Sequence, residues 1–195
     1  MKTAEHLAFY IKAIGFTLNV QHVKISYKKE RHKMLSRVLF VGRATAETCG
    51  PWPDFALISL GEPDAAEGDP QIQDGWRDVS RLSFHDITPD TLDVTCSYTL
   101  MSDEDAQKIV AFVREVAPKV DGIIVHCRAG ISRSAAVAKW ICGEYKIPFN
   151  VKYRKYNDYV YRLMVLAAAG SSDAEASEEY LAALRKSVNR EFNRE

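Results

Sequence analysis

The sequence predicts an α/β fold with a central, mostly parallel sheet of about four or five strands flanked by helices. Short apolar runs at 38–41, 55–60 and 120–125 are typical of strands that are buried on both faces. Segments with helical spacing alternate with these runs, as the crossovers of a parallel sheet require. No segment repeats, which excludes a solenoid.

Each predicted strand has a local signal. A Cys-Gly-Pro-Trp-Pro sequence, typical of a turn, separates the runs 38–41 and 55–60. The run 120–125 contains an Ile-Ile-Val core, which favours a buried strand. A shorter strand-like run over 82–86 ends at Asp86, and a proline-containing turn follows it.

Helices are predicted from apolar spacing and from capping signals. Ser102 is a typical N-cap, and three acidic residues at 103–105 follow it in the first turn. An alanine-rich helix is predicted over 134–145. Three more helices are predicted: one over about 153–169, a docked one over 4–14, and a last one that begins with the capping-box pattern of Ser172 and Glu175.

Length and composition fit a single domain over residues 1–195, with 1–35 as an N-terminal extension and 171–195 as a C-terminal helix. A chain of 195 residues with 47% apolar content can bury one substantial core. The 26 basic and 26 acidic residues cancel, so no overall field favours nucleic acid or an anionic membrane as partner. We expect the basic cluster at 24–33 to be a solvated linker or a strand edge.

No segment approaches the roughly 20 apolar residues of a membrane span, and charges interrupt the N-terminal apolar stretch, so neither a span nor a signal sequence is expected. The four cysteines show no metal-ligand spacing and no obvious disulfide framework. We therefore expect a cytoplasmic protein that uses no metal and no cofactor.

The segment 126–134, His-Cys-Arg-Ala-Gly-Ile-Ser-Arg-Ser, lies between a predicted strand and a predicted helix. Free N–H groups and the positive end of the dipole make a helix N-terminus favourable for anions. Gly130 permits a loop whose N–H groups point at one oxyanion. Arg133 can hold two phosphate oxygens, and Cys127 is the candidate thiolate nucleophile.

Two further side chains fit this chemistry. Ser134 can donate a hydrogen bond to the sulfur when it leaves, and His126 can donate to carbonyls of the loop. A cysteine and an arginine at this spacing alone arise by chance in roughly one chain in seven of this length. The additional histidine, glycine and serine lower that frequency by roughly ten-thousand-fold.

This motif resembles that of the cysteine-based protein tyrosine phosphatase superfamily and is most similar to its dual-specificity-like branch. The resemblance implies a protein tyrosine phosphatase-like fold, with the phosphate loop between a central strand and a helix. It also implies a phosphocysteine intermediate, with Cys127, Arg133 and Ser134 as catalytic residues. The implied substrate-binding residues are His126, Arg128, Ala129, Gly130, Ile131, Ser132 and Arg133.

The resemblance implies in addition a general acid some tens of positions before the cysteine, at the end of a strand. Asp86 is the candidate, since it ends the strand-like run over 82–86. Asp90 and Asp93 are the alternatives. An aspartate in a turn more commonly forms a hydrogen bond with its own backbone, so a purely structural role for Asp86 is the competing interpretation.

The implied activity is hydrolysis of phosphotyrosine in a protein or peptide, with phosphoserine and phosphothreonine left open. A pseudophosphatase that only binds phosphoproteins is one alternative. A phosphatase for phosphoinositides or RNA 5′-phosphates is another, less favoured because Arg128 is the only added charge in the loop. A low-molecular-weight phosphatase or arsenate reductase would carry its loop at the chain start, and a rhodanese-like sulfurtransferase would not need Arg133.

Overall fold

The centre of the fold is a four-stranded sheet in which every neighbouring pair of strands is parallel. The computed structural model describes residues 35–91 and 96–170, all of which belong to one compact unit, His32–Glu195. The strands are β1 (Arg37–Gly42), β2 (Phe55–Gly61), β3 (Asp78–Ser83) and β4 (Gly122–Cys127), in the order β1-β4-β2-β3. The predicted α/β class with a parallel central sheet is confirmed.

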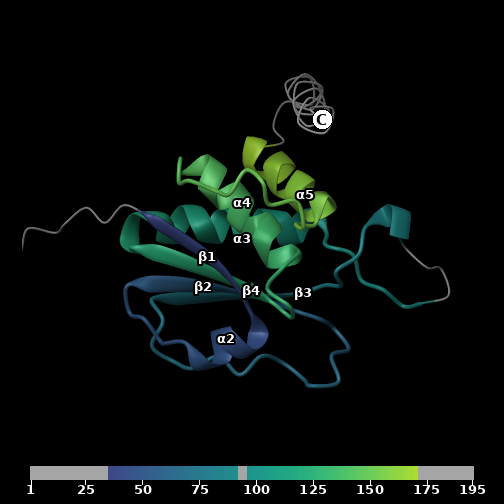
Figure 1. The fold of residues 1–195 in the computed structure, drawn as a ribbon, viewed down its shortest axis with the longest axis horizontal. Helices are drawn as coiled ribbons and strands as arrows, with labels where there is room; N and C mark the ends of the chain where they lie inside the picture. The colour runs from purple at the N-terminus through teal and green to yellow at the C-terminus, as the bar shows by residue number, and fades with distance from the viewer. Residues whose placement is uncertain (1–34, 92–95, 171–195) are drawn as a thin grey trace, which may run out of the picture. The chain divides into compact units, whose positions relative to one another are not determined.

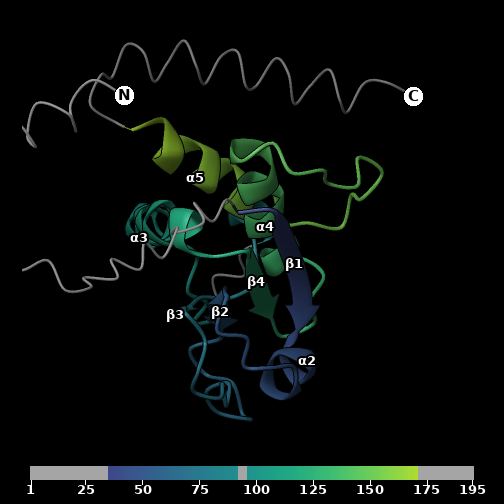
Figure 2. The same cartoon turned by 90° about the vertical axis from the view of Figure 1, so that its left-hand side faces the viewer.

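Helices cover the two faces of this sheet unequally (Figures 1 and 2). One face carries the three long helices, α3 (Asp103–Val116), α4 (Arg133–Glu144) and α5 (Asp158–Ala169). The short helix α2 (Arg43–Thr48) lies on the other face. Two short 3₁₀ turns complete the described elements, η1 (Pro89–Thr91) and η2 (Ala117–Lys119).

Alternating side chains of β2 and β4 build a separate apolar core on each face, as the period of two in a strand requires. The larger core packs against α3, α4 and α5 and includes Ala56, Ile58, Leu60, Ile123 and Val125 of the sheet. The smaller core consists of Phe55, Leu57, Trp76 and Ile124. Because both faces are covered, β2 and β4 read as continuous apolar runs in the sequence.

The long helix α3 begins where the sequence predicts it. The Ser102 hydroxyl accepts a hydrogen bond from the Asp105 backbone N–H at 3.1 Å, and the Asp105 carboxylate accepts one from the Ser102 N–H at 3.1 Å. These reciprocal bonds form a capping box. The apolar face of the helix, which includes Ile109 and Val113, is buried against the sheet. This cap and the buried face together fix α3, which leads through η2 into β4.

Several predicted boundaries were wrong. The third strand ends at Ser83, so Asp86 lies beyond it rather than at its last position. The helix expected over about 153–169 begins at Asp158, because Asn157 caps it there. β4 extends to Cys127, two residues beyond the predicted run, and helix α2 was not predicted.

Some predictions lie outside the described residues: the helix over 4–14, the basic cluster at 24–33, Asp93 and the C-terminal helix at 171–195. The proposed extent of the domain, 1–195, therefore stays a prediction. Among the described residues, no helix has both the length and the apolar character needed to cross a membrane. The same residues contain no group of His, Cys, Asp and Glu side chains arranged to hold a metal ion.

Candidate active site

The loop from Cys127 to Arg133, called the cysteine loop below, joins β4 to α4 at the carboxyl end of the sheet. β4 lies between β1 and β2, so the loop occupies the middle of the sheet and not an edge. Cys127 pairs with Gly42, the last residue of β1. Crevices at the carboxyl ends of parallel strands are the usual ligand sites of α/β proteins.

Cys127 ends β4 with its side chain on the face that α4 covers, and it is only 1% exposed. Its Sγ lies 3.2 Å from Oγ of Ser134, which is buried in the first turn of α4. Ser132 is the N-cap residue of α4, but its side chain makes no capping bond there. The cysteine therefore sits at a helix N-terminus, where the dipole favours a bound anion.

Gly130 shapes the cysteine loop. Its φ is +71°, a conformation that side chains other than glycine rarely adopt. A Cβ at this position would collide with backbone atoms of Val41 and Gly42, at the end of β1. The glycine therefore lets the loop lie directly against the neighbouring strand.

Arg133 is almost completely buried at 1% exposure, and β2 and the chain after β3 hold its guanidinium. Nη1 donates to the carbonyl oxygens of Gly61, at 2.9 Å, and Phe84. Nη2 donates to Oε1 of Glu62 at 2.6 Å. Its Nε has no hydrogen-bond partner among the described residues, although it is buried. A buried unpaired donor is costly, and an oxyanion in the loop would satisfy it.

Glu62 lies between the two arginines of the cysteine loop. One oxygen accepts from Arg133, and the other lies 3.5 Å from Nη1 of Arg128. Arg128 also lies 3.3 Å from Oε1 of Glu67, with its side chain 65% exposed. Because Arg128 is exposed and paired with two carboxylates, it differs from the buried Arg133, and each of its ion pairs contributes little stability.

Asp86, the sequence candidate for the general acid, lies beside the cysteine loop. Its Oδ1 accepts hydrogen bonds from Oγ of Ser132 at 2.7 Å and from Nδ2 of Asn157 at 3.0 Å. The same Nδ2 lies 3.3 Å from the Ile87 carbonyl, and Oδ1 of Asn157 caps α5 by accepting from the Val160 N–H. The backbone N–H of Asn157 donates to the Ser132 carbonyl at 3.2 Å. Asn157 thus connects Asp86, the cysteine loop and α5.

His85, the residue before Asp86, holds the chain from its other side. Its backbone N–H donates to the Thr99 carbonyl at 2.8 Å, and the Thr99 N–H donates to its Nδ1 at 2.9 Å. Since Nδ1 accepts, the ring proton is on Nε2, which donates to Oδ1 of Asp64 at 2.7 Å. This hydrogen bond lowers the pKa of Asp64. The position of Asp86 is therefore held by contacts from three segments, which contribute Thr99, Ser132 and Asn157.

His126 lies on the opposite face of β4 from Cys127 and is fully buried. Its Nε2 pairs with Oγ of Ser59, in β2, at 2.8 Å. Its Nδ1 has no hydrogen-bond partner among the described residues, so the predicted donation to loop carbonyls was wrong. Burial lowers the pKa of His126 to about 4, and the charge of Glu47 opposes this shift only in part. The ring is therefore neutral near pH 7, and its contact with Ser59 braces the strand that ends in Cys127.

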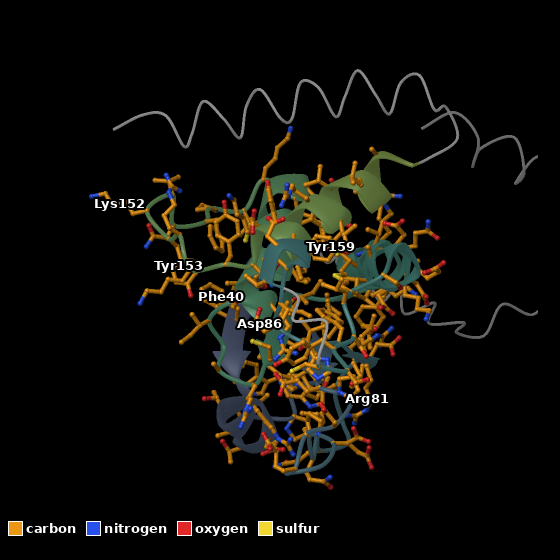
Figure 3. The ribbon with its side chains drawn as sticks, turned by 90° about the vertical axis from the view of Figure 1, so that its right-hand side faces the viewer. Phe40, Arg81, Asp86, Lys152, Tyr153 and Tyr159 are labelled. Carbon is orange, nitrogen blue, oxygen red and sulfur yellow. The ribbon has the colours of Figure 1, made fainter. Side chains whose placement is uncertain are left out.

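Tyr153 borders the cysteine loop on the β1 side. Its hydroxyl donates to the Ile131 carbonyl at 2.7 Å. Its ring meets the ring of Phe40, in β1, edge to face at a centroid distance of 5.3 Å. Burial, and next the charge of Cys127, raise the pKa of Tyr153. Figure 3 shows Tyr153 on the side of its loop that faces Phe40.

The structure thus brings together Cys127, Ser134, Arg133 and Asp86, with Ala129, Gly130 and Ile131 in the turn between strand and helix. Asp90 lies in η1, and Asp93 is not among the described residues. Sequence reasoning missed the roles of Glu62, Asp64, Asn157 and Tyr153. Only Asn157 carried a readable signal, since an asparagine before an apolar helical run is a typical N-cap.

No family model and no curated protein sequence matches the chain. Solved structures that match it include a human tyrosine phosphatase-like serine/threonine/tyrosine-interacting protein and Tk-PTP in its active form. The first is 17% identical with a TM-score of 0.43 and covers 79% of this chain and 99% of its own. The second is 16% identical with a TM-score of 0.36 and covers 77% and 92%.

Proposed function

We propose that this protein is a cysteine-dependent phosphatase that hydrolyses phosphotyrosine in proteins through a phosphocysteine intermediate. One observation carries the proposal: a buried cysteine at a helix N-terminus lies in one loop with a buried arginine whose Nε has no partner among the described residues. We infer that the phosphate of the substrate is the acceptor that this Nε lacks, and that the sulfur attacks it there. Asp86, on the chain after β3, lies beside this loop and accepts a hydrogen bond from Ser132.

In the first step, the Cys127 thiolate attacks phosphorus, an S–P bond forms and the P–O bond to the leaving group breaks. The loop N–H groups and Arg133 hold the non-bridging oxygens and stabilise the charge on them in the transition state. Asp86 gives its proton to the leaving oxygen, so that a neutral phenol departs. Between described residues, the hydrogen bonds of Asp86 all fall on Oδ1, which leaves Oδ2 as the atom proposed to carry the proton.

In the second step, water attacks the phosphocysteine, Asp86 takes up a proton from this water, and the S–P bond breaks to release inorganic phosphate. The departing thiolate gains a hydrogen bond from Oγ of Ser134, 3.2 Å from the sulfur. The enzyme returns to its starting protonation state, so the cycle needs no metal, cofactor or redox partner. We place this activity in the cytoplasm, where the thiol stays reduced.

Phosphotyrosine is the proposed substrate because the loop motif is most similar to enzymes that act on phosphoproteins. Phosphoserine and phosphothreonine are open as further substrates. Arg128 is the one additional positive charge in the loop, but Glu62 and Glu67 pair with it, so it is not free to bind a second phosphate. This pairing gives no support to a more highly charged substrate such as a phosphoinositide.

The test compares hydrolysis of a phosphotyrosine peptide and of phenyl phosphate by the wild-type protein, Cys127→Ser, Arg133→Lys and Asp86→Asn. We expect no turnover with Cys127→Ser, and a loss of about 10²- to 10⁴-fold with Asp86→Asn on phenyl phosphate. Arg133→Lys should also lose vanadate affinity, since lysine cannot form two parallel bonds. Turnover by Cys127→Ser would rule out the mechanism. Vanadate binding by a wild-type protein without turnover would show a pseudophosphatase.

A further inference from the structure

The chain between α4 and α5 carries a concentrated positive charge. Residues 145–157, called the basic segment below, contain four basic residues and no acidic one, in a chain whose total charge is zero. The four are exposed: Lys146, Lys152, Arg154 and Lys155. Figure 3 shows Lys152 pointing outward from this loop. Such a cluster raises the local concentration of anions although the whole protein is neutral.

The basic segment is fixed next to the cysteine loop. Tyr153, in its middle, donates a hydrogen bond to the Ile131 carbonyl at 2.7 Å. The rings of Phe40 and Phe149 pack around it, at centroid distances of 5.3 and 6.2 Å. The backbone that carries the positive charges is therefore held next to the cysteine loop.

These charges are not neutralised within the described part of the chain. The ion pairs between described residues involve none of the four basic residues of the segment, and Arg154 uses one guanidinium nitrogen to hold the Val151 carbonyl at 2.6 Å. By contrast, Arg128 and Arg133 of the cysteine loop have Glu62 as partner. The basic segment thus offers charge to an external partner.

The opposite side of the cysteine loop has the opposite charge. Residues 61–75, between β2 and β3, contain five acidic residues and neither lysine nor arginine. β4 lies between β1 and β2, so the basic segment, packed on β1, and this acidic segment flank the loop on its two sides. Two of the five, Glu62 and Glu67, pair with arginines of the cysteine loop. The other three would repel a membrane surface or a nucleic acid, which is negative along its whole length. A peptide can carry acidic residues on one side of its phosphate only.

The surface between the basic residues also suits a polypeptide. Val151 is 78% exposed and Ile131, in the cysteine loop itself, is 45% exposed. Exposed apolar side chains beside charged ones can contact both the apolar and the acidic side chains of a peptide that lies along this edge.

We propose that the basic segment binds acidic residues that flank the phosphorylated side chain of a protein substrate on one side. This proposal rests on the proposed phosphatase function, since it places the phosphate itself in the cysteine loop. It adds a sequence preference that the loop alone does not provide, because the loop contacts only the phosphate. Lys152 and Lys155 are its main determinants, since Arg154 also has a structural hydrogen bond.

The test measures binding and not turnover, so that it stays informative if hydrolysis fails. Fluorescence anisotropy gives Kd for phosphotyrosine peptides on the full-length Cys127→Ser protein. One peptide carries Asp and Glu before the phosphotyrosine, a second carries them after it, and a third, neutral peptide carries Asn and Gln on both sides. We expect one acidic peptide to bind about fivefold more tightly than the neutral peptide at low salt, and this preference to disappear at high salt.

Charge reversal assigns the preference to the segment. Lys152→Glu should abolish the preference for the acidic peptide, and Lys152→Arg should retain it. The control is Lys119→Glu, which makes the same charge reversal at η2, before the amino end of β4 and away from the cysteine loop, where Lys119 pairs with Glu115. It should leave the ratio of the two Kd values unchanged. Circular dichroism checks that each variant is folded.

Equal Kd values for acidic and neutral peptides, or a preference that survives Lys152→Glu, would overturn the proposal. So would tighter binding of RNA 5′-phosphates or phosphoinositide vesicles than of every phosphopeptide. If the wild-type protein hydrolyses nothing while the acidic preference is present and depends on Lys152, the proposed enzymatic function fails and the binding surface stands.

Discussion

Asn157 is the residue whose substitution tests the geometry of the proposed acid most sharply. Replacing it by aspartate keeps the cap of α5, because Asp and Asn are equally good N-caps. The change removes the donor that lies 3.0 Å from Oδ1 of Asp86 and 3.3 Å from the Ile87 carbonyl. It also places a second carboxylate beside the first. The helix should therefore remain while the hold on Asp86 is lost.

The expected size follows from the lost hydrogen bond. A hydrogen bond to a charged group contributes about 1.5–3 kcal/mol, so kcat for phenyl phosphate should fall about 10- to 100-fold in Asn157→Asp. The loss has an upper limit in the 10²- to 10⁴-fold contribution of a general acid. Repulsion between the two carboxylates favours a proton on one of them, so the pH dependence of kcat should move to higher pH.

The assay is steady-state hydrolysis of phenyl phosphate across pH, with p-nitrophenyl phosphate for comparison, since its better leaving group needs less protonation. Tyr159→Phe is the control in the same helix, because Tyr159 donates to the Met101 carbonyl and not to Asp86. In an Asp86→Asn background, Asn157→Asp should cost little more. Full activity of Asn157→Asp with an unchanged pH profile, or equal losses on both substrates, would refute this reasoning.

Three further substitutions test other parts of the site. Ser134→Ala should slow the release of phosphate about tenfold and produce a burst of phenol in stopped flow, and a rate without a burst or loss would contradict its role. Gly130→Ala should lower the free energy of unfolding by at least about 1–2 kcal/mol in urea titrations, because alanine is strained at a φ of +71°, and unchanged unfolding would argue against the close packing on β1. His126→Asn should reduce the fall of the free energy of unfolding between pH 6.5 and pH 4. The unfolded histidine takes up its proton near pH 6.5 and the folded one near its pKa of about 4, so wild-type stability is fully present above pH 6.5 and falls by about 3 kcal/mol toward pH 4. Urea unfolding at each pH measures this, and an equally steep fall of the free energy of unfolding in the wild-type and variant proteins would contradict it.

Much of the fold could be predicted because its signals are local. The apolar run that became β4 needs no partner to be recognised, since both faces of a central strand are covered. The start of α3 was equally readable, because Ser102 and Asp105 satisfy each other across three residues. Helix α2 escaped prediction because it has only six residues and Ala46 is its one buried residue.

The part of the candidate site around Cys127 is contained in one short segment, and this explains why its residues could be grouped from the sequence. Cys127, Gly130, Arg133 and Ser134 lie within eight positions, where strand end, turn and helix start set their geometry. Arg128 shows the limit of that reasoning. Whether its charge is available depends on Glu62 and Glu67, which lie on a distant part of the chain.

The supporting half of the site depends on long-range contacts, which a single sequence does not disclose. Asn157 is 71 positions from Asp86, and Glu62 is 71 positions from Arg133. The pairing of His85 with Asp64 depends in the same way on the path of residues 61–75. These partners determine the position of the acid and the arginine, so the position of Asp86 beside the loop emerges only in three dimensions.

The central claim is that Cys127 carries the phosphoryl group during turnover. Rapid acid quench of the wild-type protein with a radiolabelled phosphotyrosine peptide, followed by peptide mapping, measures this directly. The mechanism predicts transient label on the peptide that contains Cys127, formed before inorganic phosphate appears and absent in Cys127→Ser. Release of labelled phosphate at full rate with no label on the protein would contradict it.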